Sequence, residues 1–326
     1  MLLLMKKGWF VMKNLLKKIV SIICVVALLG SFTVFGAEYK DIPNDWSREG
    51  LIKAIEAGLL NGDGGFVRPS DPMTRAEMGT IMTRAFGAVK TADISMFKDV
   101  KKSDWFYDYM AKAVAMGAFK GDGENLRPNS NISRQEAMVV LSRLFAMESE
   151  NLSVLDQFKD KNKIQDWAKA GVAAVVESGY VKGSDGMVNP TANITRAEFA
   201  TIMSRMVDGY FVTSTIYTFA EDKVLDTNII IRSTNFGLEN LVSSAMIIIG
   251  DGVDGGDIVF KNVTSTGLVL IRGNNVTVDL STGTYKNVKL VGDGITVLVG
   301  EGNVENLDMG EGNTVEFAVG GEEVAE

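Results

Sequence analysis

Apolar residues recur at helical spacing in three similar stretches of the chain. The stretches read PMTRAEMGTIMTRA from Pro72, NISRQEAMVVLSRL from Asn131 and NITRAEFATIMSRM from Asn193. In the first stretch Met78, Ile81 and Met82 fall three and four residues apart, which gathers them on one face of a helix. The pattern therefore predicts three helices that each bury one face.

Each of these helices has a start signal made of two polar residues. A hydroxyl side chain at the N-cap and a glutamate three residues later form a capping box, in which each side chain bonds to the backbone N–H of the other residue. The predicted capping residues are Thr74 and Glu77, Ser133 and Glu136, and Thr195 and Glu198. We therefore expect the helices to begin at residues 75, 134 and 196.

The three helices belong to a repeated unit. Trp46, Trp105 and Trp167 are 59 and 62 residues apart, and several glycines and prolines keep the same register. Each unit reads as a helix that begins near the tryptophan, a glycine-rich loop, and then the capped helix. Because one unit cannot bury both faces of its helices alone, the three units are expected to pack as one pseudo-threefold body.

Helical spacing ends after about Val207, and short β-branched runs take its place. Runs such as NIIIR at Asn228 and ITVLV at Ile295 are separated by Gly, Asn and Asp, which is typical of strands joined by turns. An asparagine followed by Leu or Val recurs at residues 240, 262, 287 and 306. This period predicts a parallel β-solenoid in which these asparagines stack at one turn. An antiparallel sandwich is the alternative.

The chain is expected to be an α plus β multidomain protein. Residues 1–37 read as a secretory signal peptide, with lysines ahead of an apolar run, and its start is either Met1 or Met12. An uncleaved membrane anchor is the alternative, although the apolar run is short for a span. The expected domains that follow are three helical repeats at 38–208 (38–90, 95–148 and 156–208), a β-solenoid at 209–320 and an acidic tail at 321–326.

Charge and composition exclude several classes of function. The formal net charge is −8, and loss of the five lysines within residues 1–37 makes it −13, so nucleic acid is not an expected partner. The absence of histidine from the sequence excludes a Ser-His or Cys-His nucleophilic site and removes the commonest metal ligand. We therefore expect no cofactor, no metal and, after signal cleavage, no membrane contact.

One residue of each capped helix conflicts with the electrostatics of helix ends. Arg75, Arg134 and Arg196 occupy the first helical position, where the macrodipole disfavours a cation. An arginine that faces the free N–H groups of the first turn makes a site for an anion, and its planar fork can bind a carboxylate through two bonds. A structural salt bridge is the alternative, and its candidate partners are Asp41, Asp99 and Asp160.

The glycine-rich loops and the tryptophans are further candidates for ligand contact. Glycine permits positive φ and lets the backbone approach a ligand closely, whereas the few aspartates of the loops do not suffice for calcium. The tryptophans either fill the core or stack a flat indole face on a sugar ring. The candidate loop residues are Gly62, Asp63, Gly64, Gly121, Asp122, Gly123, Gly183, Asp185 and Gly186.

Residues 39–208 resemble the S-layer homology domain in three copies. The shared motifs are F-x-D, the tryptophan, two spaced glycines, the GDG loop, a proline and TRAE. The resemblance implies a three-pronged helical pseudo-trimer that binds a secondary cell wall polysaccharide, which is linked to peptidoglycan and often carries a ketal-linked pyruvate. It implies that Arg75, Arg134 and Arg196 grip the pyruvate carboxylate in grooves between repeats. Trp46, Trp105, Trp167 and the loop residues would lie close by.

The third repeat departs from the other two. Its loop reads Gly183-Ser184-Asp185-Gly186, with one more residue between the glycines, and Asn189 stands where the other repeats have Arg68 and Arg127. We therefore expect the groove of Arg196, beside this loop, to be altered.

The expected function is non-catalytic. A secreted protein of the bacterial cell wall or S-layer surface would bind a wall glycan through its helical body, and the solenoid would stand outward as a spacer, adhesin or lattice element. The alternatives are a wall-tethered polysaccharide lyase or hydrolase and a minor S-layer lattice subunit, the latter with self-association through the solenoid.

Overall fold

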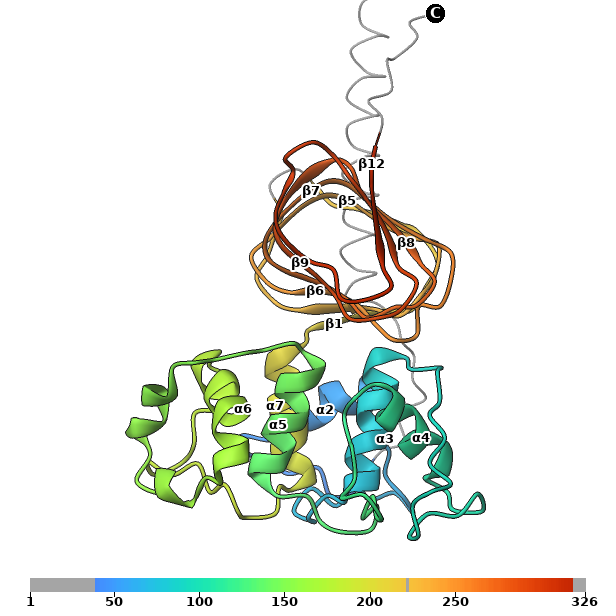
Figure 1. Cartoon of the computed structure of the whole chain (residues 1–326). Coiled ribbons are helices and arrows are strands. Elements are labelled where there is room, and N and C mark those ends of the chain that lie inside the picture. Colours follow the sequence, from blue (N-terminus) through green and yellow to red (C-terminus); the bar gives the residue numbers. More distant parts are fainter. Residues whose placement is uncertain (1–38, 221–222, 319–326) are drawn as a thin grey trace, which may run out of the picture.

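The computed structural model describes residues 39–220 and 223–318, which form a helical part and a β-solenoid stacked on it (Figure 1). The signal peptide expected at residues 1–37 and the acidic tail expected at 321–326 lie outside the described residues. Within the described residues, every helix falls short of the length and apolar character that a membrane crossing requires.

The helical part takes two α-helices from each repeat. They are α2 (Arg48–Glu56) and α3 (Arg75–Phe86), α4 (Tyr107–Ala115) and α5 (Arg134–Leu144), and α6 (Asp166–Glu177) and α7 (Arg196–Met206). Two short 3-10 turns, η1 (Leu152–Gln157) and η2 (Lys161–Lys163), precede α6. The expected helix starts and capping boxes are confirmed at α3, α5 and α7.

Helices of different repeats pack in pairs, which closes the repeats into a ring. Helix α3 of the first repeat packs on α4 of the second, α5 of the second on α6 of the third, and α7 of the third on α2 of the first. At the centre, backbone N–H groups donate in a cycle, from Met73 to Ile194 (2.9 Å), from Ile194 to Ile132 (3.0 Å) and from Ile132 to Met73 (2.9 Å). The cycle confirms the expected pseudo-threefold body.

The solenoid consists of short strands in parallel pairs. They are β1 (Gly209–Phe211), β2 (Ile216–Thr218), β3 (Val224–Leu225), β4 (Ile229–Ile231), β5 (Phe236–Ser243), β6 (Ile247–Ile249), β7 (Asp257–Ile271), β8 (Thr277–Leu280), β9 (Gly283–Leu290), β10 (Thr296–Val299), β11 (Val304–Asp308) and β12 (Thr314–Phe317). Val278 lies against Val297, and Val297 against Val315, so successive coils stack like residues in one core. The parallel β-solenoid is confirmed, and the antiparallel sandwich is wrong.

The single asparagine stack expected in the solenoid is wrong, because Asn287 stands 25 residues after Asn262 whereas Val263 pairs with Gly283, only 20 residues on. Asn262 Nδ2 donates to Asn240 Oδ1 at 2.9 Å, and Asn306 Nδ2 donates to Asn287 Oδ1 at 3.1 Å. These are two separate stacks. In the next coil Thr282 takes the place beside Asn262, whose N–H donates to the Thr282 hydroxyl at 3.1 Å, and Asn287 lies opposite Leu268. A recurring Asn-Leu or Asn-Val pair therefore does not mark the same position around every coil.

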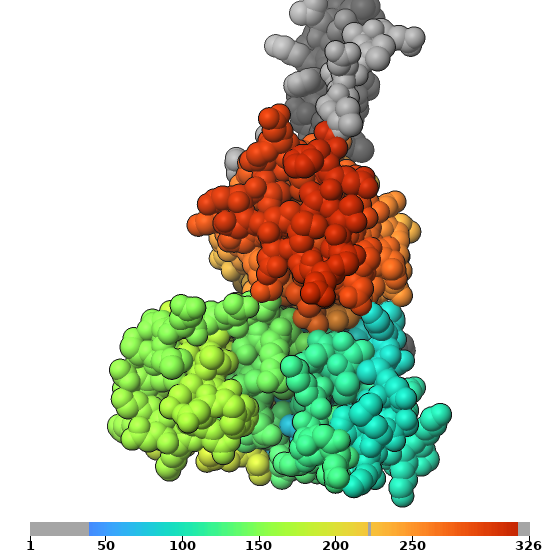
Figure 2. Space-filling view, in the orientation of Figure 1, coloured from blue at the N-terminus to red at the C-terminus, as the bar shows by residue number. Residues whose placement is uncertain are grey.

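A run of isoleucines joins the solenoid to the helical part. Strands β4 and β6 are buried at every position, without the alternation of a half-exposed strand, which indicates that both faces are covered. Ile229 and Ile231 point into the solenoid core, whereas Ile230 belongs to the core of the helical part, together with Ile248 and Leu270. In the space-filling view the two parts meet without a visible gap (Figure 2).

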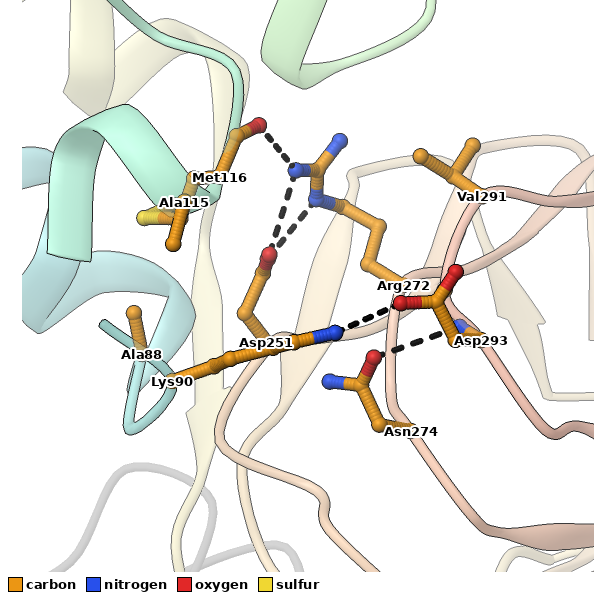
Figure 3. Close-up of a pocket in the computed structure, with 10 residues that line it drawn as sticks. Ala88, Lys90, Ala115, Met116, Asp251, Arg272, Asn274, Val291 and Asp293 are labelled. Atoms are coloured by element: carbon orange, nitrogen blue, oxygen red, sulfur yellow. Dashed lines mark hydrogen bonds and ion pairs between the residues drawn. The ribbon is translucent and has the colours of Figure 1, made fainter. Parts of the chain in front are cut away.

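Arg272 supplies the polar centre of this joint (Figure 3). Its Nε donates to Asp251 at 2.7 Å, its Nη1 to the carbonyl of Leu144 at 3.2 Å and its Nη2 to the carbonyl of Met116 at 2.9 Å. A pocket of about 80 Å³ lies beside these groups, with the Lys90–Asp293 ion pair among its walls. The arginine thus bonds to the solenoid and to two helix ends at once.

All three capped helices reach the solenoid at their C-terminal ends (Figure 1). Arg272 bonds to Leu144, the last residue of α5, and Arg232 Nη1 donates to the carbonyl of Arg84 in the last turn of α3. Helix α7 ends at Met206, and the chain enters β1 at Gly209. Cations at helix C-termini also complement the macrodipole. The solenoid therefore sits on the opposite end of these helices from Arg75, Arg134 and Arg196.

Candidate glycan-binding grooves between the repeats

The side chains of the three arginines at the helix starts, Arg75, Arg134 and Arg196, each reach from their own repeat to the next repeat in the ring. Each Nε donates to a carbonyl of the neighbouring glycine-rich loop, and each Nη1 pairs with the capping glutamate of that neighbour. The Nε bonds run from Arg75 to Leu126 (3.0 Å), Arg134 to Val188 (2.9 Å) and Arg196 to Val67 (2.7 Å). The ion pairs are Arg75–Glu136 (3.3 Å), Arg134–Glu198 (2.8 Å) and Arg196–Glu77 (2.9 Å).

The salt-bridge partners expected from the sequence are therefore wrong. The aspartates of the F-x-D motifs instead hold the ends of the loops. Asp41 accepts the backbone N–H groups of Val67 and Arg68 at 2.8 and 2.6 Å. Asp99 and Asp160 do the same in the second and third repeats. Because these carboxylates are occupied by backbone, the capping glutamates are left to neutralise the arginines.

The backbone N–H groups at the helix starts, which were expected to be free beside the arginines, form hydrogen bonds within the described residues. In the first turn of α3 the N–H of Arg75 donates to the carbonyl of Ser130 at 3.0 Å, and that of Ala76 to the carbonyl of Pro128 at 2.9 Å. Helices α5 and α7 bond to their neighbouring loops in the same way. An anion would therefore meet the guanidinium groups and not the open end of a helix.

The guanidinium groups are mostly covered but not entirely. The side chains of Arg75, Arg134 and Arg196 are 15, 11 and 11% exposed. Arg196 Nη2 donates to the carbonyl of Asn61 at 2.8 Å, whereas among the described residues the Nη2 groups of Arg75 and Arg134 find no acceptor. Burial lowers the pKa of Arg75, and the nearby Glu136 opposes that shift. An arginine in this setting remains a cation.

The loop of the third repeat has the same length as the other two and the same turn as the first. The N–H of Ser184 donates to the carbonyl of Met187 at 2.9 Å, as that of Asp63 does to Phe66 at 2.9 Å. Ser184 thus holds the place of Asp63, and Asp185 holds the place of Gly64 with a similar φ, 53° against 59°. The third loop is changed in its side chains and not in its backbone length.

The changed loop lies beside Arg134 and not beside Arg196, which corrects the expectation from the sequence. Each arginine bonds to the loop of the next repeat, so Val188 of the third loop accepts from Arg134, while Arg196 reaches Val67 of the first loop. Sequence order alone does not reveal this shift by one repeat.

Two arginines that the sequence analysis did not select take part in the loops. Arg68 Nη2 lies 3.2 Å from the carboxylate of Asp63, and Arg127 Nη2 lies 2.6 Å from that of Asp122. Hydrogen bonds from Arg127 and from the loop backbone hold the pKa of Asp122 at about 2. The signal available in the sequence was an Asp and an Arg five residues apart in two of the three loops.

The tryptophans lie on the surface, so their alternative role in the core is wrong. Trp46, Trp105 and Trp167 are 63, 61 and 54% exposed. Trp105 meets the buried ring of Phe106 edge-on, with ring centroids 5.5 Å apart, and Trp167 Nε1 donates to the side chain of Gln165. Exposed indole faces of this kind are available to stack on a ligand ring.

Glu198 caps α7 and pairs with Arg134. Its replacement by alanine should therefore lower the free energy of unfolding by more than the loss of a helix cap alone. The change removes the capping box of α7 and leaves the largely buried Arg134 without its carboxylate. We expect a loss of about 1–3 kcal/mol in the free energy of unfolding, measured with urea. Glu177→Ala at the end of α6 is the matched control and should change stability by less than about 0.5 kcal/mol. Equal losses in both variants would contradict a bridging role for Glu198.

Comparisons with known proteins identify the family of the repeats. A family model for the S-layer homology domain matches residues 38–78, 97–138 and 157–200. The Surface-layer 125 kDa protein of Lysinibacillus sphaericus is 34% identical over 169 residues, which cover 50% of this chain and 14% of that protein. Exoglucanase XynX of Acetivibrio thermocellus is 30% identical over 177 residues, covering 52% of this chain and 16% of its own length.

The cellulosome-anchoring protein of Acetivibrio thermocellus is 31% identical over 166 residues, which cover 47% of this chain and 36% of that protein. The chain thus spans well under half the length of these curated relatives. What they share with it is about as long as the helical part. The three repeats of this chain are S-layer homology domains.

Proposed function

We propose that the chain holds itself non-covalently at the bacterial cell wall by binding a secondary cell wall polysaccharide in the grooves between its repeats. The observation that carries the proposal is the placement of Arg75, Arg134 and Arg196. Each guanidinium is held at the junction with the neighbouring repeat, with its Nε at 2.7–3.0 Å from a loop carbonyl. A fixed planar fork suits a carboxylate, and a ketal-linked pyruvate would supply one.

The polarity of the molecule supports an outward-facing solenoid. The arginines stand at the N-terminal ends of α3, α5 and α7, and the solenoid contacts the C-terminal ends of the same helices (Figure 1). When the grooves face the wall, the solenoid points away from it. In that position it serves as a spacer, an adhesin or a lattice element, and none of these roles requires catalysis.

The names of the relatives support an anchoring role for the shared part. One relative is a surface-layer protein, one an exoglucanase and one a cellulosome-anchoring protein. A set of repeats shared by proteins with such different names is suited to a function that these proteins have in common, such as attachment. The exoglucanase aligns over only 16% of its own length, so its activity is not carried over to this chain.

A wall-binding assay tests the proposal. Purified chain is mixed with three wall preparations, namely intact wall, wall from which mild acid has removed ketal pyruvate, and peptidoglycan stripped of its polysaccharide. Charge-assisted hydrogen bonds contribute about 1.5–3 kcal/mol each, so loss of pyruvate should weaken binding at least tenfold. Equal binding to the first two preparations would exclude the arginine–carboxylate contact. Equal binding to the stripped peptidoglycan would exclude the polysaccharide as ligand.

A further inference from the structure

The three glycine-rich loops have the same length and end in the same backbone conformation. The residue before the loop proline has a left-handed φ in every repeat, 56° at Arg68, 54° at Arg127 and 51° at Asn189. The turn that precedes it closes with the same N–H to carbonyl bond, at 2.9–3.0 Å. The loops therefore end alike, and the first and third loops also share the β-bridge of their turn, which is not formed between Asp122 and Asn125 of the second loop. The first and third loops thus differ chiefly in their side chains.

The charged pair of the first two loops contributes little to stability. The side chains of Arg68 and Asp63 are 55 and 86% exposed, and those of Arg127 and Asp122 are 61 and 34% exposed. Ion pairs between side chains this exposed to solvent contribute about 0–1 kcal/mol to the free energy of unfolding. The pairing instead holds a guanidinium at the loop surface, where its remaining N–H groups face solvent.

The third loop lacks both members of this pair. Ser184 replaces the aspartate and Asn189 replaces the arginine, and the charged side chain that remains in the loop is Asp185, which stands where the first two loops have a glycine. Asparagine tolerates the left-handed φ that this position needs, which keeps the loop in the same conformation. The two changes together remove a cation from one groove and keep its shape.

In the first two loops, the arginine that the third loop lacks lies next to a residue bonded to a groove arginine. Arg127 follows Leu126, the residue whose carbonyl accepts from Arg75, and the positive charge of Arg127 contributes to lowering the pKa of Arg75. Arg68 follows Val67 in the same way beside Arg196. Since Arg196 Nη2 already bonds to Asn61, Arg68 is the more exposed donor of that groove.

We propose that the three grooves select sugars of different charge. The grooves of Arg75 and Arg196, each with a second arginine at the loop, take anionic sugar residues such as a pyruvylated one. The groove of Arg134, where Asn189 offers an amide in place of a second arginine, takes an uncharged sugar of similar size. The inference rests on the proposed wall-glycan function and assigns its substrate class groove by groove.

Titration calorimetry on the full chain tests the assignment. The probes are a short pyruvylated wall-glycan fragment and the same fragment after acid removal of pyruvate. Wild-type chain should bind two pyruvylated fragments. S184D/N189R restores the ion pair of the third loop and should raise this number to three, whereas the matched variant D122S/R127N should lower it to one. At the restored groove the affinity for the pyruvylated fragment should rise about tenfold.

The outcomes separate this inference from the function on which it rests. Three equal sites in wild-type chain, or two sites in S184D/N189R, would overturn the assignment and leave wall-glycan binding intact. Failure of wild-type chain to bind either fragment would overturn the proposed function itself. The exchanged side chains lie in exposed loops, and an unchanged melting temperature would show that the variants fold normally.

Discussion

Replacing Arg272 by alanine is expected to lower the free energy of unfolding by about 3–5 kcal/mol. The Arg272 side chain is 3% exposed, and its partner Asp251 is 13% exposed. The change leaves the Asp251 carboxylate buried without a cation. It also leaves the carbonyls of Leu144 and Met116 without their donor at the joint. Urea unfolding, followed by far-UV circular dichroism, measures the loss.

Two further variants show whether the charge itself is responsible. Lys90→Ala removes an ion pair at the same joint, but both side chains of that pair are more than half exposed, so it should cost at most about 1 kcal/mol. The double variant R272M/D251L removes both buried charges and should recover part of the loss. Equal destabilisation by Arg272→Ala and Lys90→Ala would contradict a central role for Arg272.

Replacing the three exposed tryptophans by alanine should weaken wall binding on the order of a hundredfold and leave the fold intact. Stacking on an aromatic face contributes about 0.5–1.5 kcal/mol per contact, and contacts made by one chain on one polymer reinforce one another. The indole rings of Trp46, Trp105 and Trp167 are more than half exposed, so their loss removes little packing. Sedimentation with purified wall measures binding, and the melting temperature reports folding.

Phe317→Ala is the matched control for this variant. Phe317 is 71% exposed, lies in β12 of the solenoid and is remote in sequence from the repeats. Its removal should leave wall binding unchanged. If the triple tryptophan variant sediments with wall as well as wild-type chain does, indole stacking is not part of the recognition.

The features that the sequence predicts well are those with local causes. A threonine or serine followed three residues later by glutamate caps a helix through bonds within a single turn, and all three caps form. A period near twenty residues fixes a parallel solenoid because each coil must lie on the previous one. The exposure of the tryptophans was left open, since a large ring fits either a core or a surface.

The features that the sequence does not give are those with distant causes. Arg196 bonds to Val67, 129 residues earlier in the chain, and nothing local to α7 indicates that carbonyl. The ring order of the repeats decides which loop each arginine meets, so the changed third loop was assigned to the wrong groove. Likewise, Ile230 reads as a strand residue, but only the docked helices show what covers its outer face.

The attachment of all three capped helices to the solenoid has a mechanical consequence. A force that pulls on the solenoid is transmitted to α3 through Arg232, to α5 through Arg272 and to α7 through the polypeptide chain itself. It then travels along the helix axes to Arg75, Arg134 and Arg196. If the grooves bind wall glycan as proposed, the pull is divided among three grooves side by side, and no single glycan contact has to withstand the whole force.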